Sequence, residues 1–315
     1  MENIVVATFY HFTCFKDPAK LRKPLLAQLS EHDLKGTVLL AREGLNGTLA
    51  GSRVGIDAAL DILRALPNSM QLEHKESHAK SMPFYRLKVR LKKEIVTMGV
   101  PNIDPSVSVG TYVAPKDWNV LISDPETIVI DARNNFEAKI GTFERAINPG
   151  TTSFSDLPQW LDKHRAELKK KKVAMFCTGG IRCEKATSYL KGRGIDDVFH
   201  LKGGILQYLK NIPEAESRWR GECFVFDYRV SVKHGLELGE YEQCHACRRP
   251  VNATGRASST FVAGVSCDNC IDQRTNEQRA RYAARQTQVK LANERGELHI
   301  GKTYETVKKS NAFDG

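Results

Sequence analysis

Apolar residues in the first ninety-five positions recur with the spacings of alternating strands and helices. Apolar residues at every second position predict strands, and intervals of three and four predict amphipathic helices. Asp17 and Ser52 stand where helix N-caps are expected. The pattern predicts, in order, a strand over 3–12, a helix over 17–33, a hairpin over 36–51, a helix over 53–66 and a strand over 84–93. This β-α-β-β-α-β order is typical of a ferredoxin-like domain, which we place at residues 1–95.

Strands and helices alternate again after a polar, proline-containing connector over 96–123. Strands are expected over 127–133, 172–177 and 197–201, helices over 155–168 and 183–194, and the segment 202–209 completes the unit. Because strands separated by helices pair in parallel, residues 124–217 are predicted to form an α/β domain with a parallel sheet. Residues 218–315 form a less regular, cysteine-rich region with a basic helical stretch over 274–296.

The chain of 315 residues carries a net charge of +10, which favours a polyanionic partner. The excess is spread along the chain, so a nucleic-acid footprint would be shared between domains. No stretch approaches the ~20 apolar residues that span a bilayer, and the N-terminus lacks the pattern of a secretory signal. Eight cysteines in such a chain indicate reduced thiols. We therefore expect a cytoplasmic protein that contacts no membrane.

One cysteine, Cys177, ends an apolar strand and opens a glycine-containing loop that leads into a helix. Backbone N–H groups of such a loop can point inward, and the helix adds the positive end of its dipole. Both effects, together with the charge of Arg182, lower the pKa of a thiol and favour the reactive thiolate. The predicted site is Cys177 as the reactive residue, surrounded by Thr178, Gly179, Gly180, Ile181, Arg182 and Cys183. The alternative is a buried, inert cysteine.

The loop and its surroundings resemble the rhodanese family, whose reactive cysteine begins a six-residue loop. Other marks of that family are Asp-Ala-Arg at 131–133 followed by Glu137, a Gly…Ala…Asn turn at 141–150, and Gly-Gly-Ile-Leu-Gln-Tyr-Leu at 203–209. The spacing Cys-x4-Arg is the loop size that cradles a sulfur-bearing group in rhodaneses. Related phosphatases use one residue more, so phosphatase chemistry is disfavoured.

The order of motifs over residues 3–275 resembles the bacterial tRNA uridine(34) hydroxylase family. The motifs are EGLNGTLAG at 43–51, CTGGIRCEK at 177–185, WRGECFVFDYRVSV at 219–232 and two later Cys-x-x-Cys pairs. The resemblance implies oxygen-dependent conversion of the wobble uridine to 5-hydroxyuridine, with molecular oxygen as co-substrate and an essential cysteine at Cys177. It implies the anticodon loop of tRNA as partner, and no DNA. The sequence carries no flavin, haem or nicotinamide signature.

Two other functions remain open at this point. A rhodanese-type sulfurtransferase would pass persulfide sulfur into tRNA thiolation or a sulfur relay, and an RNA-binding adaptor would use the loop only to recognise anions. For the hydroxylase, Cys183 is a candidate resolving thiol that condenses with oxidised Cys177, or it merely packs in the first helical turn. Asp131 and Arg133 are expected to support the loop by pairing with each other or bracing its neighbour.

The segment over 84–93 combines alternating cations with aromatic residues. Its predicted RNA-binding residues are Phe84, Tyr85, Arg86, Lys88, Arg90 and Lys92. Four cations on one strand face can follow a phosphate backbone, while aromatic rings stack an unpaired base. The alternative is a solvated strand face, or an edge that lysine and arginine protect against aggregation.

Four cysteines near the C-terminus are spaced as in tetrahedral zinc sites. They are Cys244, Cys247, Cys267 and Cys270. Two Cys-x-x-Cys pairs separated by nineteen residues form two knuckles, and a site filled by four thiolates is structural because it leaves no position for substrate. The alternatives are two Cys-x-x-Cys disulfides or a site that loses its metal on purification.

Overall fold

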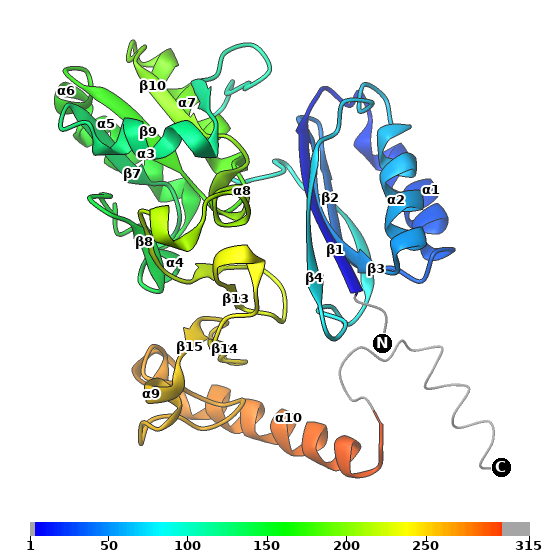
Figure 1. The fold of residues 1–315 in the computed structure, drawn as a ribbon. Coiled ribbons are helices and arrows are strands. Elements are labelled where there is room, and N and C mark those ends of the chain that lie inside the picture. The colour runs from blue at the N-terminus through cyan, green and yellow to red at the C-terminus, as the bar shows by residue number, and fades with distance from the viewer. Residues whose placement is uncertain (1–3, 298–315) are drawn as a thin grey trace. The chain divides into compact units, whose positions relative to one another are not determined.

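The computed structural model describes residues 4–297 of the chain. They form two compact units, one up to Gly239 and one from Glu240 onward (Figure 1). The first unit holds two large β-sheets, and the second holds a cysteine cluster and a long helix. Among these described residues, no helix is both long and apolar enough to cross a membrane.

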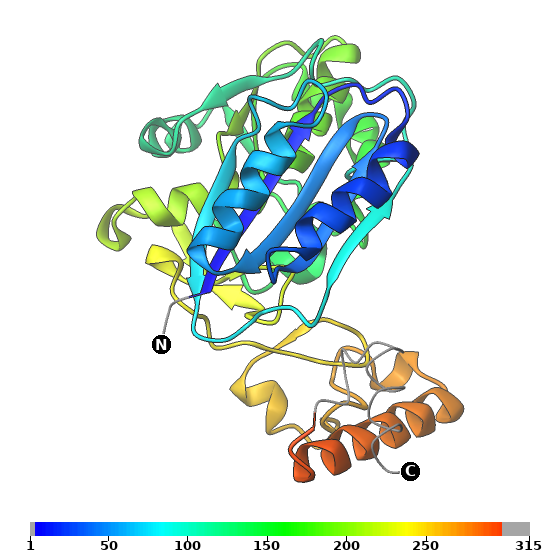
Figure 2. The same cartoon turned by 90° about the vertical axis from the view of Figure 1, so that its right-hand side faces the viewer.

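The first sheet has five strands in the order β4-β1-β3-β2-β5, with two helices on one of its faces (Figure 2). Its elements are β1 (Ile4–Phe12), α1 (Pro18–Ser30), β2 (Lys35–Ala41), β3 (Gly44–Gly51), α2 (Arg53–Arg64), β4 (His74–Ala79) and β5 (Leu87–Leu91). Both expected helix caps are present, since Asp17 accepts a hydrogen bond from the N–H of Ala19 and Ser52 accepts one from that of Gly55. The order of the first six elements confirms the ferredoxin-like prediction.

The strand that closes the ferredoxin-like order is β4, and the prediction that residues 84–93 close it was wrong. β4 pairs antiparallel with β1, whereas β5 runs parallel to β2 at the opposite edge of the sheet. β4 reads His-Lys-Glu-Ser-His-Ala, so it offers no apolar alternation for a pattern to detect. β5 is an added fifth strand.

Alternation along these strands separates a helix-covered face from an open one. The covered face is an apolar core that includes Val5, Ala7, Phe9, Val38 and Leu40. In β5, Val89 joins this core. Lys88 and Arg90 are paired in register with Thr37 and Leu39, so all four lie on the open face.

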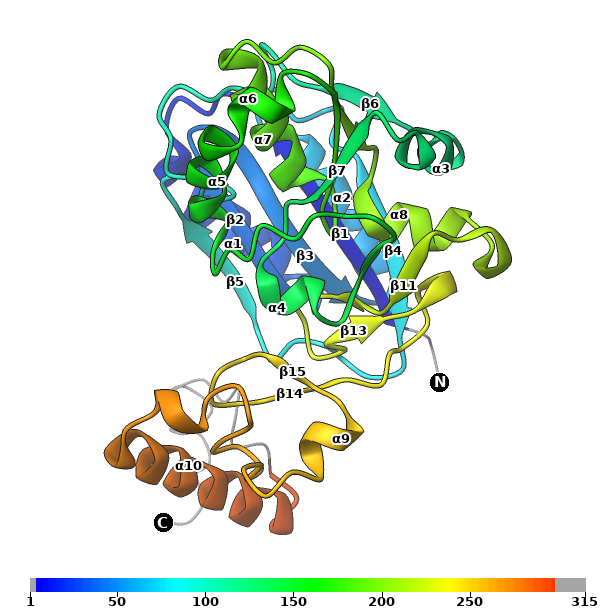
Figure 3. The same cartoon turned by 90° about the vertical axis from the view of Figure 1, so that its left-hand side faces the viewer.

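The second sheet has four parallel strands in the order β6-β10-β9-β7, which confirms the predicted parallel α/β domain. Its edge strands, β6 and β7, are labelled in Figure 3. Its elements are β6 (Thr111–Val113), α3 (Pro115–Ser123), β7 (Thr127–Asp131), α4 (Asn135–Ala138), α5 (Leu157–Lys163), α6 (Arg165–Leu168), β9 (Lys172–Phe176), α7 (Ile181–Gly192), β10 (Val198–Leu201) and α8 (Gly204–Asn211). Val173 and Met175 of β9 pack with α5 and α7, while Ala174 and Phe176 pack with α3 and α8. Burial on both faces explains why β9 is apolar almost throughout.

Two parts of this sheet differ from the sequence pattern. The segment 96–123, expected as a connector, supplies β6 and α3 to the sheet and its core. The single helix expected over 155–168 is divided into α5 and α6 at His164, whose backbone leaves the helical region. The His164 ring stacks on Trp160 at 4.0 Å between centroids and hydrogen-bonds to the Trp160 carbonyl oxygen, which stabilises the break.

Residues 218–239 belong to the first unit, although the sequence pattern groups them with the cysteine-rich region. Their first strand, β11 (Trp219–Gly221), pairs antiparallel with β8 (Gly141–Phe143) of the preceding domain. Their next two strands, β12 (Cys223–Phe224) and β13 (Ser231–Val232), pair antiparallel with each other. Trp219 is 2% exposed and packs against Phe143. This segment therefore completes the core beside α3 and α8.

The second unit is built around its cysteines. It contains β14 (Glu242–Gln243), β15 (Pro250–Val251), α9 (Ala253–Arg256) and α10 (Asn276–Glu294). Helix α10 lies within the predicted stretch over 274–296 and begins at a capping box between Thr275 and Gln278. The rest of the expected tail, 298–315, lies outside the described residues.

Candidate active site at Cys177

The Cys177 loop joins a buried strand to a helix, as the sequence pattern predicts. β9 ends at Phe176 and α7 begins at Ile181, so the loop is short. Gly180 has a φ of 105°, and a Cβ at this position would lie 2.7 Å from the hydroxyl oxygen of Tyr10, so glycine is required. The N–H of Gly180 donates a hydrogen bond to Cys177 Sγ at 3.2 Å. The loop thus turns a backbone donor toward the thiol.

A second glycine lets α8 approach the loop. A Cβ at Gly204 would lie 2.5 Å from the carbonyl oxygen of Cys177. This approach allows the N–H of Ile205 to donate to the Cys177 carbonyl at 3.0 Å and the N–H of Leu206 to donate to the Thr178 carbonyl at 3.1 Å. The first turn of α8 therefore fixes the backbone orientation of the loop.

The surroundings of Cys177 favour its ionised form. Burial alone would raise the pKa of this thiol, which is 1% exposed. A hydrogen bond from the Cys183 thiol, the charge of Arg182 and backbone N–H groups outweigh burial and lower the pKa of Cys177 to about 5. Burial and the neighbouring Cys177 thiolate raise the pKa of Cys183. At neutral pH, the pair is one thiolate beside one thiol that donates a hydrogen bond to it.

Arg182 is held by Glu137, a carboxylate to which the sequence analysis assigned no role in the site. Two nitrogens of Arg182 donate to the two carboxylate oxygens at 2.7 and 2.8 Å. The Glu137 side chain is 0% exposed and that of Arg182 is 8% exposed. Thr178 of the loop also donates to Glu137, at 3.3 Å. The positive charge beside Cys177 is therefore fixed by a buried, bidentate ion pair.

Asp131 and Arg133 form a second buried ion pair in the same domain. Arg133 Nη2 donates to Asp131 Oδ2 at 2.6 Å, and both side chains are 0% exposed. The same nitrogen donates to the carbonyl oxygen of Gly141 at 2.6 Å. Thr142 donates to Asp131 at 3.1 Å. The pair thus fastens the end of β7 to β8.

A buried acid lies on the other side of the loop, and sequence reasoning missed it. Glu184 follows Cys183 in the first turn of α7, and its Oε1 accepts a hydrogen bond from the Tyr10 hydroxyl at 2.7 Å. Burial raises the pKa of Glu184 and lowers that of Lys75, whose Nζ lies 5.2 Å from the centroid of the Tyr10 ring. The partners come from β1 and β4, so no local motif could reveal them.

The next residue, Lys185, connects α7 to the turn between β2 and β3. Its Nζ lies 2.8 Å from a carboxylate oxygen of Glu43 and 2.5 Å from one of Glu94. It also donates to the carbonyl oxygen of Val96 at 3.1 Å. The Lys185 side chain is 2% exposed, so this contact is a buried link between the two sheets of the first unit.

A cavity of about 430 Å³ lies between the open face of the first sheet and the cysteine loop. The sheet contributes threonine, tyrosine and asparagine side chains, and the loop contributes Thr178, Gly179, Ile181 and Arg182. Phe84, which the sequence analysis selects for RNA binding, lines the cavity, as do Phe154 and Phe226. Tyr85 instead packs edge to face on Tyr228, with 4.4 Å between the ring centroids.

The predicted RNA-binding cations border the same face of the sheet. Lys88 and Arg90 are paired in register with Thr37 and Leu39, which line the cavity. Arg86, Arg90 and Lys92 are exposed to solvent. The structure thus brings part of the predicted basic strand next to the cavity that the cysteine loop borders.

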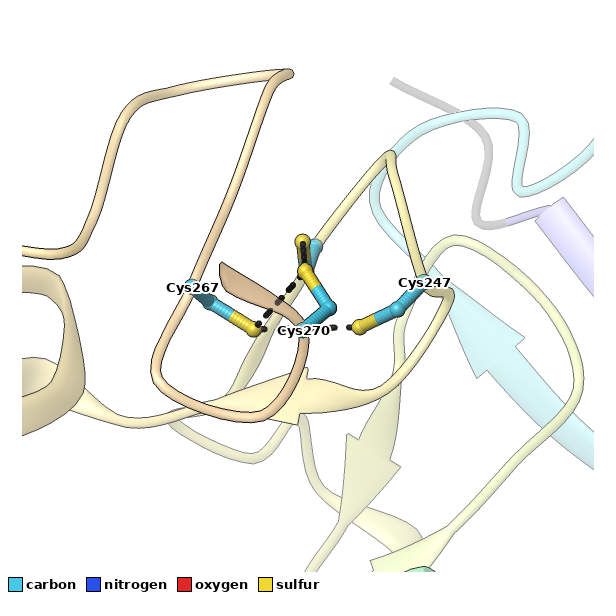
Figure 4. Close-up of side chains that lie close together, drawn as sticks. Cys247, Cys267 and Cys270 are labelled. Atoms are coloured by element: carbon cyan, nitrogen blue, oxygen red, sulfur yellow. Dashed lines mark hydrogen bonds between the residues drawn. The ribbon is translucent and has the colours of Figure 1, made fainter. Parts of the chain in front are cut away.

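The four C-terminal cysteines converge, with their sulfur atoms all within 4.8 Å of one another. Adjacent sulfurs are 3.7 Å apart for Cys247 and Cys267, and 3.8 Å apart for Cys267 and Cys270 (Figure 4). A tetrahedron with metal–sulfur bonds of about 2.3 Å has edges of about 3.8 Å. Arg285 of α10 donates to the carbonyl oxygens of His245 and Gly264, and so joins the two knuckles. This donor set can hold a metal ion.

Two known domain families match the parts of the chain that form the two large sheets of the first unit. Residues 4–95 match the UPF0176 acylphosphatase-like domain, and residues 114–211 match the rhodanese-like domain. The rhodanese-like domain of an Anabaena protein is a solved structure 16% identical to this chain, with a TM-score of 0.29, and the match covers 35% of this chain and 78% of that one.

Longer matches extend beyond these domains. A tRNA uridine(34) hydroxylase of Gluconobacter oxydans is 57% identical over 304 residues, which cover 95% of this chain and 97% of the relative. A tRNA uridine(34) hydroxylase of Teredinibacter turnerae is 56% identical over 301 residues, which cover 96% of this chain and 94% of the relative. Because relatives that are more than half identical align over nearly the whole chain, the protein belongs to the tRNA uridine(34) hydroxylase family.

Proposed function

We propose that the protein converts uridine 34 of tRNA to 5-hydroxyuridine in the cytoplasm, with molecular oxygen as co-substrate and Cys177 as the reactive thiolate. The observation that carries this proposal is the buried Cys177 thiol, which accepts a hydrogen bond from the Gly180 N–H at 3.2 Å in the Cys-x4-Arg loop of a chain from this family. The surroundings of this thiol lower its pKa and favour the thiolate. A thiolate is the nucleophilic form of cysteine, and C6 of uracil is the electrophilic end of its C5–C6 double bond. The reaction class is thus an oxidation assisted by a thiol.

The atom balance of this oxidation gives Cys183 a role. One atom of O₂ enters the C5–H bond as the hydroxyl group, and the other leaves as water after taking up two electrons and two protons. Cys177 and Cys183 release two electrons and two protons when they join in a disulfide. Uridine, O₂ and two thiols then give 5-hydroxyuridine, water and one disulfide, which a cellular dithiol reduces for the next cycle.

Growth under ¹⁸O₂ tests the oxygen assignment. In cells that contain the protein, nucleosides derived from 5-hydroxyuridine should gain one ¹⁸O atom, and mass spectrometry of digested tRNA measures this label. Cells without the gene should lack the labelled nucleosides. A hydroxyl oxygen that comes from water would contradict the proposed use of O₂.

Replacing Cys183 with serine should slow repeated turnover by about tenfold or more. One conversion per chain should persist, because the Cys177 thiol can take up the second oxygen atom of O₂ and become a sulfenic acid, which then has no resolving thiol beside it. Serine preserves the hydrogen-bond donor beside Cys177 but cannot form a disulfide. The measurement is the number of tRNA molecules hydroxylated per chain over time. Cys223→Ser is a matched control, because Cys223 is also buried. Undiminished turnover of Cys183→Ser over many cycles would remove the resolving role and leave Cys183 as a packing residue.

We infer that the exposed cations in β5 and next to its ends, Arg86, Arg90 and Lys92, contact the phosphate backbone of the anticodon arm. Reversing the charges of Arg86 and Arg90 should weaken tRNA binding by a similar factor for all tRNA sequences and flatten its salt dependence. Titration of labelled tRNA at several salt concentrations measures both effects. Charge reversal at Lys20, an exposed lysine of the helix-covered side, is the control. Equal affinity and salt dependence in both variants would contradict the inference.

Zinc is the metal that suits the four-cysteine cluster, and it would be structural because all four positions are thiolates. The full chain should contain one zinc ion, measured by elemental mass spectrometry, and Cys267→Ser should contain almost none. Cys14→Ser should keep the metal, because Cys14 is exposed and outside the cluster. Detection of two disulfides in place of the metal, in protein freshly purified without added oxidant, would contradict this assignment.

A further inference from the structure

The cavity between the open face of the first sheet and the cysteine loop has the size and lining of a site for a single base. Its volume of about 430 Å³ falls within the roughly 300–1,000 Å³ of small-molecule sites. It lies beside the loop of the proposed reactive cysteine, and a nucleobase can reach such a site only if it leaves the base stack. A tRNA anticodon loop offers unpaired bases that can be turned outward.

The rim of the cavity carries an exposed aromatic ring. Phe226 is 64% exposed, although it is a large apolar side chain. Phe224 packs edge to face against it at 5.0 Å, and the Arg182 guanidinium lies 5.9 Å from its centroid. The ring is therefore held from two sides while it remains open to solvent. Aromatic rings in this state serve as stacking platforms for unpaired bases in RNA-binding proteins.

The polar lining of the cavity is largely uncharged. Arg182 is its permanently charged side chain, and Glu137 neutralises it through a bidentate pair. Thr8 and Thr48 hydrogen-bond to each other at 3.1 Å between their hydroxyl oxygens. An uncharged base is therefore a better ligand for this lining than a phosphate group. The cations of β5, on the same face of the sheet, can bind the phosphates of the same RNA.

Asn46 supplies an oriented acceptor in this lining. Its side-chain nitrogen donates to the carbonyl oxygen of Ile95 at 2.9 Å, which fixes the amide plane. In the described part of the chain, its side-chain oxygen accepts no hydrogen bond. Uracil carries an N–H donor at N3, whereas cytosine carries a lone pair at that atom. An acceptor held in place distinguishes the two pyrimidines, because cytosine would leave it unpaired against another acceptor.

We propose that this cavity binds the flipped uracil base of RNA, with Phe226 as the stacking platform and the Asn46 side-chain oxygen as the acceptor that selects uracil over cytosine. The proposal rests on the proposed function for its substrate. It goes further by naming the residues that hold the base and the atom that reads it. Both are positioning and specificity residues, since neither is assigned a bond to the reacting C5 atom.

Binding of synthetic anticodon stem-loops to the full chain tests the proposal without requiring turnover. Wild type should bind a stem-loop with uridine 34 more tightly than one with cytidine 34. Phe226→Ala should weaken binding of both about tenfold or more, and Phe226→Tyr should restore it. Asn46→Ala should bring the two affinities close together. Val120→Ala is the control, because Val120 is 77% exposed on α3 and outside the lining.

Photo-crosslinking of a stem-loop with 5-bromouridine at position 34 gives a direct readout of contact. The crosslinked peptide should contain Phe226, Phe84 or Phe154, which line the cavity. A crosslink elsewhere in the chain, or unchanged affinity and selectivity in the Phe226 and Asn46 variants, would overturn the proposal even if the chain hydroxylates uridine 34. If the chain binds stem-loops as predicted but cells show no hydroxylation of uridine that depends on the gene, the proposed function fails and the proposed base site does not. The two failures are therefore distinguishable.

Discussion

Replacing Cys177 with serine is expected to lower the rate of uridine hydroxylation by about 1,000-fold or more. A hydroxyl group in place of the thiol has almost the same shape and can still accept the hydrogen bond from Gly180. It does not ionise near neutral pH and cannot undergo thiol redox chemistry. Initial rates on unmodified tRNA, measured by nucleoside mass spectrometry, check this result. Cys14→Ser, at an exposed thiol, should keep the wild-type rate.

The same substitution should change how stability depends on pH. The pKa of Cys177 lies near 5 in the folded chain and near 9 for a free thiol. Because the pKa is lower in the folded chain, ionisation of Cys177 stabilises the folded state. This stabilisation is complete above about pH 9, decreases as the pH falls, and is absent below about pH 5. The stability advantage of wild type over Cys177→Ser should therefore shrink from pH 9 to pH 5. Urea midpoints at both values measure it, and an advantage that grows on acidification would contradict the low pKa.

Glu137→Gln should destabilise the first unit by about 3–5 kcal/mol and abolish most activity. Glu137 is 0% exposed and receives two hydrogen bonds from Arg182, so the amide would leave the guanidinium buried without its counter-charge. Arg182 would then be free to reorient, and the charge that lowers the pKa of Cys177 would no longer be held in place. Urea unfolding and the hydroxylation rate measure the two effects.

Glu144→Gln is the matched control for this variant. Glu144 also pairs with two arginines, Arg218 and Arg220, but these pairs are exposed to solvent. Solvent-exposed ion pairs contribute little to stability, so its urea midpoint should stay close to that of wild type. Equal losses of stability in Glu137→Gln and Glu144→Gln would show that the buried Arg182–Glu137 pair stabilises the protein no more than an exposed pair does. This result would contradict the account of the loop.

The loop of Cys177 could be predicted from sequence because its determinants are local. A buried apolar strand, two glycines and a helix follow one another within a few residues, and each leaves a pattern. The partners of the loop are not local. Glu137 reaches Arg182 across 45 residues, and Tyr10 reaches Glu184 across 174. Only the paired strands and packed helices bring these side chains together.

Non-local contacts also limit what could be predicted about the strands of the first sheet. β5 has an alternating pattern and was predicted as a strand, yet its place in the sheet was wrong. β4 has no such pattern, because both of its faces are partly exposed at an edge. Its position is set by its hydrogen bonds to β1, a strand that is distant from it in the sequence. Strand pairing is therefore harder to predict than strand formation.

Mass spectrometry of tRNA nucleosides tests the central claim most directly, in cells that lack this gene and are complemented with wild type or Cys177→Ala. We predict that 5-hydroxyuridine derivatives disappear from the deletion strain and that only wild type restores them. The contradicting result is the loss of thiolated nucleosides while hydroxylated ones persist. It would mean that the Cys177 loop takes part in sulfur transfer, the chemistry that the resemblance of its size to rhodanese loops implies.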